Sequence, residues 1–194
     1  MAFDSQPYLR GKLVELRPLT ERDYRDLYAA AADPAIWEQH PDRDRHREAV
    51  FERYFRDALA SRGTLTVRDC ENGRVIGSSR YHCDHEHRSE IEIGWTFLAR
   101  SHWGGAYNGE LKHLMLGHAF RSIETVVFLV APQNVRSQCA IERIGGVRSG
   151  WRPDATGRPN LIYRIEARDW LEQTDHRQAR PQRLPNPNTR SWQR

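Results

Sequence analysis

The segment with the clearest capacity for chemistry is a run of small residues that opens a predicted helix. Gly104, Gly105 and Ala106 follow an alternating segment over 91–98 and stand where a helix over about 104–121 begins. The first N–H groups of a helix have no partner within it, and the helix dipole adds positive charge there. Small residues let a phosphate reach these groups. The pattern predicts an anion site; a tight turn that serves packing alone is the alternative.

Two common phosphate-binding motifs do not fit this turn. A P-loop ends in Gly-Lys-Ser or Gly-Lys-Thr, and neither follows Gly109. The order of residues over 104–109 does not match GxGxxG, and hairpin strands rather than a β-α-β unit precede it. The remaining interpretation is that the turn binds a pyrophosphate in a fold other than these two.

A second segment begins where a buried apolar strand over 125–131 ends. Asn134 is an N-cap residue type ahead of a predicted helix over 134–144, and Ser137 follows at the capping-box distance. Taken alone, the pair indicates only a capped helix.

Together the two segments resemble the GCN5-related N-acetyltransferase (GNAT) family, in particular its ribosomal-protein alanine acetyltransferase (RimJ/RimL-type) branch. The resemblance covers roughly residues 10–170. Ser101, Asn108-Gly109 and Gly146 depart from the family pattern; the last two of these departures affect the acyl pocket and not the cofactor site. The motifs that carry the resemblance are Glu92-Ile93-Gly94-Trp95, Trp103-Gly104-Gly105-Ala106-Tyr107, Asn134-Val135-Arg136-Ser137 and Glu142-Arg143-Ile144-Gly145-Gly146.

The resemblance implies acetyl-CoA as co-substrate, in the gap between the strands over 91–98 and 125–131. Backbone at Phe97 and Ala99 would pair with the pantetheine amides. N–H groups from Gly104 to Asn108 would hold the pyrophosphate, and Asn134 the pantetheine arm. The implied cofactor-binding residues are Phe97, Leu98, Ala99, Trp103, Gly104, Gly105, Ala106, Tyr107, Asn108 and Asn134.

Acetyl transfer to an amine needs a base for the amine and an acid for the thiolate. Glu92 alternates with apolar residues on the central strand, where partial burial would raise its pKa, and it is the candidate base. Glu90 lies on the same face and is the second candidate base. The alternative to a catalytic role for Glu92 is a structural ion pair with an arginine. Ser137 matches the family's proton donor, with plain capping as its alternative.

The acceptor side is assigned to Trp37 and His40, which fall where the family's first helices form the acceptor cleft, and to Glu90. A structural role is the alternative for Trp37. We expect a small-molecule amine or a peptide N-terminus as the acceptor. No metal is expected: His82, Asp84, His85, Glu86 and His87 fall in a predicted hairpin loop, whereas zinc sites prefer fixed spacing on formed elements.

These residues need a frame of strands and helices. Hydrophobic periodicity gives the order β-α-α-β-β-β-α-β-α-β-β, including a helix over 43–61. The fold class is α/β (α+β), which the resemblance specifies as the GNAT fold: a mixed, mostly antiparallel sheet of about seven strands flanked by helices. We expect one acetyltransferase domain over 1–170 and an Arg/Pro-rich tail over 171–194, disordered or lightly docked.

Charge and composition narrow the functional class of the protein further. Of the net charge of +4, residues 168–194 hold +3 (six Arg against three acidic residues), which leaves +1 elsewhere and disfavours a nucleic-acid-binding protein. Three widely spaced cysteines, no secretory pattern and no apolar run beyond 126–131 favour a cytoplasmic protein without a membrane partner. A non-catalytic acyl-CoA-binding module is the main rival to the enzyme, and a homodimer is left open.

Overall fold

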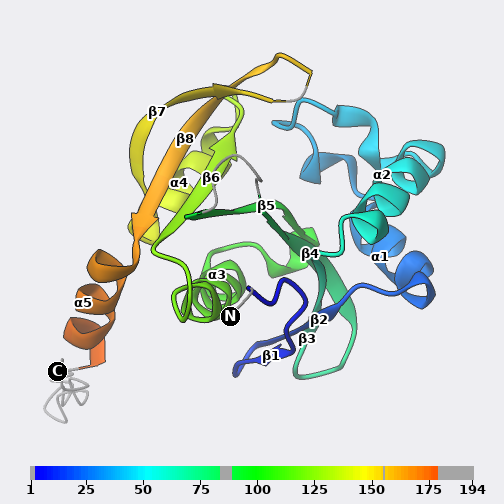
Figure 1. Cartoon of the computed structure of the whole chain (residues 1–194). Coiled ribbons are helices and arrows are strands. Elements are labelled where there is room, and N and C mark those ends of the chain that lie inside the picture. The colour runs from blue at the N-terminus through cyan, green and yellow to red at the C-terminus, as the bar shows by residue number, and fades with distance from the viewer. Residues whose placement is uncertain (1–2, 84–88, 155, 179–194) are drawn as a thin grey trace, which may run out of the picture.

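A computed structural model describes residues 3–83, 89–154 and 156–178, built around one eight-stranded sheet (Figure 1). The strand order is β1-β2-β3-β4-β5-β6-β8-β7, and each neighbouring pair is antiparallel except β5 and β6. The mixed, mostly antiparallel sheet is confirmed; the additional strand is the two-residue β1. The bounds are β1 Leu9–Arg10, β2 Val14–Pro18, β3 Thr64–Asp69, β4 Val75–His82, β5 Glu90–Leu98, β6 Thr125–Val130, β7 Val147–Pro153 and β8 Pro159–Glu166.

The central strand β5 has one face in the main core and one face toward the site. Ile91 and Ile93 are each 1 % exposed and pack with the core residues of neighbouring strands. Glu90, Glu92 and Gly94 alternate with them on the opposite face, as the period of two predicts.

The strands β5 and β6 separate partway along their length. Their parallel pairing ends where Glu92 lies beside Val127. Beyond this point β5 carries a bulge, seen as a register shift against β4 between Ser78 and Arg80 and as a φ of +49° at Trp95. A bulge bends and twists its strand. The backbone edge of β5 that would face β6 is therefore open after Glu92.

Helix α3, Ala106–Ala119, lies against the sheet with Leu111 in the main core. Its first turns are fixed by Glu110. The Glu110 carboxylate accepts hydrogen bonds from the backbone N–H groups of Lys12, Leu13 and Val14 at 2.9, 2.6 and 2.8 Å. One carboxylate thus attaches the helix to the start of β2 and positions the helix N-terminus.

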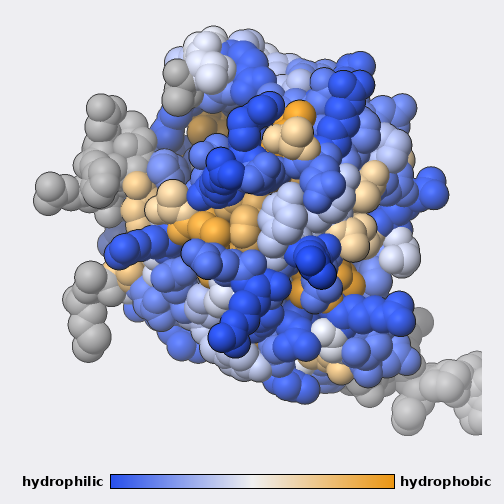
Figure 2. Space-filling view, turned by 90° about the vertical axis from the view of Figure 1, so that its right-hand side faces the viewer, coloured by the Kyte–Doolittle hydropathy of each residue, from blue (hydrophilic) through white to orange (hydrophobic). Residues whose placement is uncertain are grey.

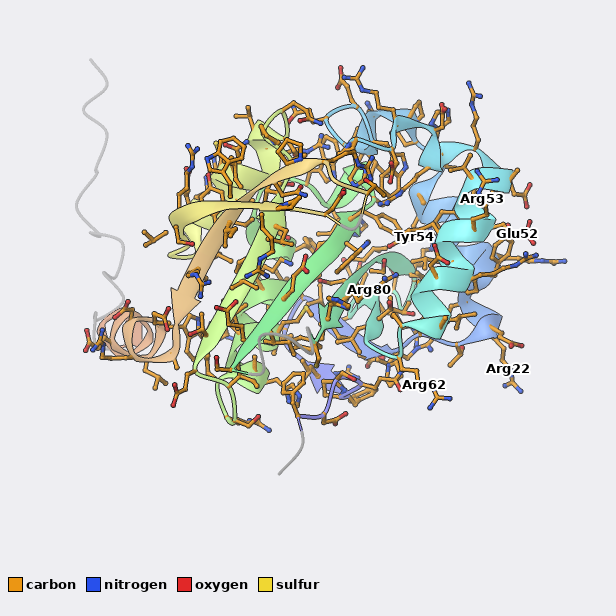
Figure 3. All side chains as sticks on the ribbon, turned by 45° about the horizontal axis from the view of Figure 1, so that its top comes forward. Arg22, Glu52, Arg53, Tyr54, Arg62 and Arg80 are labelled. Atoms are coloured by element: carbon orange, nitrogen blue, oxygen red, sulfur yellow. The ribbon has the colours of Figure 1, made fainter. Side chains whose placement is uncertain are left out.

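Two further helices, α1 (Tyr24–Ala31) and α2 (Glu48–Ala60), enclose a second, smaller core. Tyr54 points from α2 toward the sheet, whereas Glu52 and Arg53 point outward (Figure 3). The single helix expected over 43–61 is wrong in its first turn: a 3-10 turn over Arg43–His46 precedes α2, because Arg47 is extended, with φ −82° and ψ 129°.

The chain closes with α4 (Val135–Arg143), the β7–β8 hairpin and α5 (Ala167–Gln178). Trp170 of α5 packs against the rings of His113 and Phe120, with centroids 5.2 and 5.5 Å away. Helix α5 extends past residue 170, the expected end of the domain, as far as Gln178. Residues 179–194 lie outside the described ranges, and the expectation for the tail stays a prediction.

The face of the molecule in Figure 2 is mostly hydrophilic, with hydrophobic residues in separate groups between charged ones. This agrees with a mean hydropathy of −0.81. Among the helices that the structure describes, none combines the length and the apolar character needed to cross a membrane.

Candidate active site

A cavity of about 430 Å³ lies where β5 and β6 separate. Its floor and walls come from β5, β6, α3 and α4, and its mouth from residues 37–45 and the β7–β8 hairpin. The residues that line it include Trp37, His40, Asp42, Arg45, His82, Glu92, Gly94, Trp95, Thr96, Asn108, Lys112, Phe128, Asn134, Ser137, Asp154 and Arg158. The elements predicted to hold cofactor and base therefore meet around one space.

The glycine turn forms an open cradle at the N-terminus of α3. Gly104 and Gly105 have φ of +106° and +109°, and a Cβ at either position would meet no atom within 4 Å. A positive φ favours glycine, and the open space lets a ligand approach the backbone. Ala106 begins the helix and is exposed. The turn thus meets the requirement for a phosphate on helix N–H groups.

Aromatic side chains hold this turn in place. The Trp103 indole N–H donates to the Leu98 carbonyl at 2.9 Å. Tyr107 packs against the main core and meets the His102 ring edge-on at 4.7 Å. Asn108, one residue further, lines the cavity. Of the residues predicted to bind the cofactor, Trp103 and Tyr107 support the cradle from below, whereas Asn108 faces the space beside it.

The backbone pairing implied for Ala99 is wrong. Its N–H donates to the Ile76 carbonyl at 2.7 Å, and its carbonyl accepts from the His102 N–H at 2.9 Å. Both groups are engaged within the protein. Since backbone groups alternate along a strand, Thr96 and Leu98 direct theirs away from β4, toward the open edge of β5, where the Leu98 carbonyl accepts the Trp103 indole N–H. The bulge at Trp95 shifts this parity, and no sequence pattern reveals it.

The side chain of Phe97 also has an internal role. It is buried and its ring lies 5.1 Å from that of Trp37, in the second core. Trp37 is 3 % exposed, and its indole N–H donates to the Ala31 carbonyl at 2.8 Å. Trp37 therefore contributes a fixed apolar wall to the acceptor side, with its polar atom already satisfied.

The two candidate carboxylates have different surroundings. Glu90 forms ion pairs with Arg164, and with Arg152 at 3.5 Å, so two arginines of β8 and β7 hold it. Glu92 lines the cavity, beside its cross-strand neighbour His82. Its carboxylate lies over Gly94, which leaves the space that it occupies. This geometry favours Glu92 over Glu90 for contact with a reacting amine.

Trp95 is fixed between two side chains of β4. The Arg80 guanidinium lies 4.6 Å from its ring centroid and the His82 ring 5.6 Å away. Arg80 is buried, projects from β4 in Figure 3, and donates to the Thr64 hydroxyl at 2.9 Å. The bulged residue, three positions after Glu92, is thus held between these two side chains.

Asn134 and Ser137 lie together at the N-terminus of α4. The Asn134 side-chain oxygen accepts from the Ser137 backbone N–H at 3.1 Å, which confirms the predicted cap. Both residues also line the cavity. Capping uses the Asn134 oxygen only, and its NH₂ group retains donors for a ligand.

His40 is present at the mouth as a neutral ring. Its Nδ1 accepts from the Asp42 N–H at 2.9 Å, and the Arg45 guanidinium lies 3.2 Å from Nε2. Burial, followed by the charge of Arg45, lowers the pKa of His40 to about 3. The ring is therefore uncharged at neutral pH and cannot attract a cation by charge.

An ion-pair network crosses the mouth, and the sequence did not indicate it. Asp42 bonds to Arg45 at 2.7 Å and to Arg158 at 2.9 Å, and Arg158 reaches Asp154 at 3.0 Å. Asp42 and Arg158 are 116 positions apart. The network joins the acceptor-side segment to the β7–β8 hairpin, and only the folded topology brings these residues together.

Sequence reasoning also missed Lys112, one of two lysines in the chain. It is 4 % exposed and lines the cavity from α3. Its Nζ donates to the Thr96 hydroxyl at 2.6 Å and lies 3.5 Å from the Ser79 hydroxyl. One signal was present: Lys112 is next to Leu111 and one turn from Asn108, on a helix face that the apolar pattern marks as buried.

No group of three His, Cys, Asp or Glu side chains suited to a metal occurs within the described ranges. Of the histidine-rich segment, His82 is on β4; residues 84–87 lie outside those ranges.

A family model for the acetyltransferase (GNAT) domain matches residues 14–147. No curated protein sequence matches the chain significantly.

Solved structures show the same architecture. The chain is similar to a GCN5-related N-acetyltransferase from Brucella melitensis, with TM-score 0.78, 20 % identity, and coverage of 90 % of this chain and 85 % of that one. It is also similar to Mycobacterium smegmatis RimJ in complex with CoA-disulfide, with TM-score 0.66, 19 % identity, and coverage of 90 % of this chain and 98 % of that one. A third similar structure is a chimera of the spermidine N-acetyltransferase SpeG from Vibrio cholerae and hSSAT, with TM-score 0.63, 18 % identity, and coverage of 82 % of this chain and 99 % of that one. At these identities the likeness establishes the fold.

Proposed function

The chain belongs to the GNAT acetyltransferase family, and from this premise we propose that it transfers an acetyl group from acetyl-CoA to a primary amine. The family match establishes an acetyltransferase that uses an acyl-CoA. We propose three further points: that the acyl group is acetyl, that the acceptor is a primary amine, and that the amine attacks the acetyl group directly. The acceptor is a small-molecule amine or a protein N-terminus.

One observation supports the proposal above the others: Thr96 on the open edge of β5, Asn108 in the first turn of α3 and Glu92 border one cavity, and the glycine cradle lies at the start of the same helix. A phosphate at Gly104–Ala106 and an acyl group near Glu92 would be the two ends of one extended ligand. The backbone of Thr96 and Leu98 and the Asn134 amide stand along the path between them. This arrangement suits the phosphates, amides and thioester of an acyl-CoA in that order.

The chemistry assigned to the protein begins with Glu92. Acetyl-CoA, when bound, supplies the activated acyl group. Glu92 takes a proton from the acceptor ammonium, directly or through water, and the neutral nitrogen then attacks the acyl carbon. The C–N bond forms, the C–S bond breaks, and its electron pair leaves with sulfur.

The departing sulfur needs a proton, and two donors line the cavity. Ser137 is the donor expected from the sequence; Lys112 is the second. A hydroxyl and an ammonium differ in acid strength, so experiments can distinguish Ser137 from Lys112 as the proton donor.

Two features support an amine as the acceptor. Glu92 places a carboxylate on the acceptor side, and the aromatic residues Trp37 and Trp95 line the same space. A cation is attracted both by a carboxylate and by an aromatic face. We also propose the RimJ/RimL-type branch, on the strength of the turn over Trp103–Tyr107 and the structural likeness to RimJ. N-terminal peptides therefore belong in the acceptor screen beside free amines.

The test follows the release of CoA thiol from acetyl-CoA in the presence of polyamines, amino sugars and N-terminal peptides, side by side. We expect at least one class to raise release above the rate without acceptor, and Glu92→Gln to remove most of the increase. If acetyl-CoA raises the melting temperature but no acceptor raises thiol release, the chain is a non-catalytic acyl-CoA-binding module. If acetyl-CoA has neither effect, the cofactor assignment itself is wrong.

A further inference from the structure

Lys112 is a buried cation that has no carboxylate partner among the residues that the structure describes. Its Nζ has two hydroxyl neighbours, Thr96 at 2.6 Å and Ser79 at 3.5 Å, and lies 5.4 Å from the centre of the Phe128 ring. These neighbours come from β5, β4 and β6, the three strands packed against it, and none of them ionises near neutral pH. A buried ammonium without a counter-ion is costly, so its retention at a cavity wall points to a ligand.

Burial lowers the pKa of Lys112 to about 7. At neutral pH the group therefore exists in both protonation states and can exchange a proton with a neighbour. A pKa near the working pH is the condition under which an acid–base group is most effective.

Lys112 also lies on the path of the cofactor. It follows Gly105 by seven residues, which is about 10 Å along α3, and Asn108 lies one turn nearer the cradle on the same side. Its partner Thr96 is four residues along β5 from Glu92, with the bulge between them. A ligand that runs from the cradle to Glu92 therefore passes the Lys112 ammonium before it reaches the carboxylate.

We propose that Lys112 is a catalytic residue, whose ammonium contacts the sulfur of the bound acyl-CoA and protonates it as the C–S bond breaks. The inference rests on the proposed function. As the C–N bond forms, the C–S electron pair moves to sulfur, and sulfur takes a proton from Lys112, which becomes a neutral amine. Glu92 holds the first proton of the acceptor ammonium, and the nitrogen loses its second proton to water as the amide forms. Exchange with water then restores both side chains, and the products are the amide and CoA thiol.

An ammonium suits this step better than the Ser137 hydroxyl. It attracts the thiolate by charge while the bond breaks, and it is a far stronger acid than a serine hydroxyl. Ser137 already donates its backbone N–H to the cap of α4, and its side chain can assist through water.

The decisive variant is Lys112→Met, which keeps the length of the side chain and removes its charge. We expect kcat for acetyl transfer to fall about 100-fold or more, with KM for acetyl-CoA nearly unchanged and the alkaline limb of the pH–rate profile lost. The melting temperature should stay level or rise, because an uncompensated buried charge has gone. Ser137→Ala is the matched control and should lower kcat less.

Two outcomes would overturn the assignment. One is a Lys112→Met enzyme with the kcat and the alkaline limb of the wild type. The other is a loss of activity together with a lower melting temperature, which would make Lys112 a structural residue.

A second measurement works without any acceptor. CoA thiolate absorbs in the ultraviolet, so the ionisation of bound CoA can be titrated directly. In the wild type, the thiol should ionise at lower pH than in free CoA, because the ammonium stabilises the thiolate; in Lys112→Met the shift should vanish. Equal titrations in the two proteins would exclude the contact. If no acceptor turns over, the proposed function fails, and this titration still decides the role of Lys112.

Discussion

The carboxylate of Glu92 occupies the space that a side chain at Gly94 would need: a Cβ at residue 94 would stand 2.9 Å from Glu92 Oε1. The two residues alternate on the same face of β5, next to the bulge at Trp95. A side chain at residue 94 would therefore meet the candidate base.

Gly94→Ala is expected to displace Glu92 and lower kcat by about 10-fold or more, since small misplacements of a catalytic group have large effects on rate. The acetyl-CoA-induced rise in melting temperature should persist, because the cradle is unchanged. Steady-state kinetics and thermal shifts on the same samples measure both. Unchanged kcat would mean that the exact place of this carboxylate does not matter.

Glu92→Gln keeps the shape of the side chain and removes its basicity. We expect kcat to fall by about 10²–10⁴-fold and the acidic limb of the pH–rate profile to disappear. Glu90→Gln is the matched control: it weakens the pairs with Arg164 and Arg152, so it should reduce stability more than kcat. A reversed result would assign the base to Glu90. Full activity in both variants would mean that water deprotonates the amine and that the protein only positions it.

Acetyl-CoA at 100 times its dissociation constant should add about 2.7 kcal/mol to the unfolding free energy of the wild type. Gly104→Glu should abolish this gain, because its carboxylate would repel the phosphates in the cradle. Gly104→Lys carries the same backbone strain at φ +106° with the opposite charge, and it should retain part of the gain. Equal losses in the two variants would point to strain, and retention in both would place the phosphates elsewhere. Thermal or urea unfolding with and without ligand measures the difference.

His40 makes stability depend on pH in a defined window. Its pKa is about 3 in the folded protein and near 6.5 in the unfolded chain, so between these values only the unfolded state takes up the proton. Stability due to the neutral ring is therefore present above about pH 6.5 and is lost as the pH falls toward 3.

In urea unfolding, the midpoint of the wild type should fall between pH of about 7 and about 4.5, and that of His40→Gln should fall less. The carboxyls whose pKa is lowered, Asp23, Asp42 and Asp154, titrate below this window. Equal decreases in the two proteins would show that His40 is accessible to protons in the folded state.

Much of the frame was predictable because it depends on local pattern. Alternation gave the two faces of β5, and the small residues at 104–106 marked the start of α3. The cap formed by Asn134 is likewise a contact between near neighbours in the sequence. These features follow from periodicity and capping, which act over a few residues.

The features that escaped prediction depend on long-range geometry. The bulge at Trp95 changes which backbone groups of β5 are open, so Ala99 was assigned wrongly. The Asp42–Arg158 pair spans 116 positions. Lys112 differs from these, because a charged residue on an apolar helix face is visible in the sequence. The sequence does not reveal that no carboxylate pairs with it among the residues that the structure describes.

The three hydrogen bonds of Glu110 have a consequence for the order of folding. They connect α3 to backbone 96–98 positions earlier in the chain, so they form only after a long loop has closed. Contacts of such high sequence separation slow folding, and local helix formation precedes them. The N-terminus of α3 is thus immobilised late. During refolding, the ability to bind acyl-CoA should therefore appear with the last, slowest phase, whereas helical circular dichroism should appear earlier.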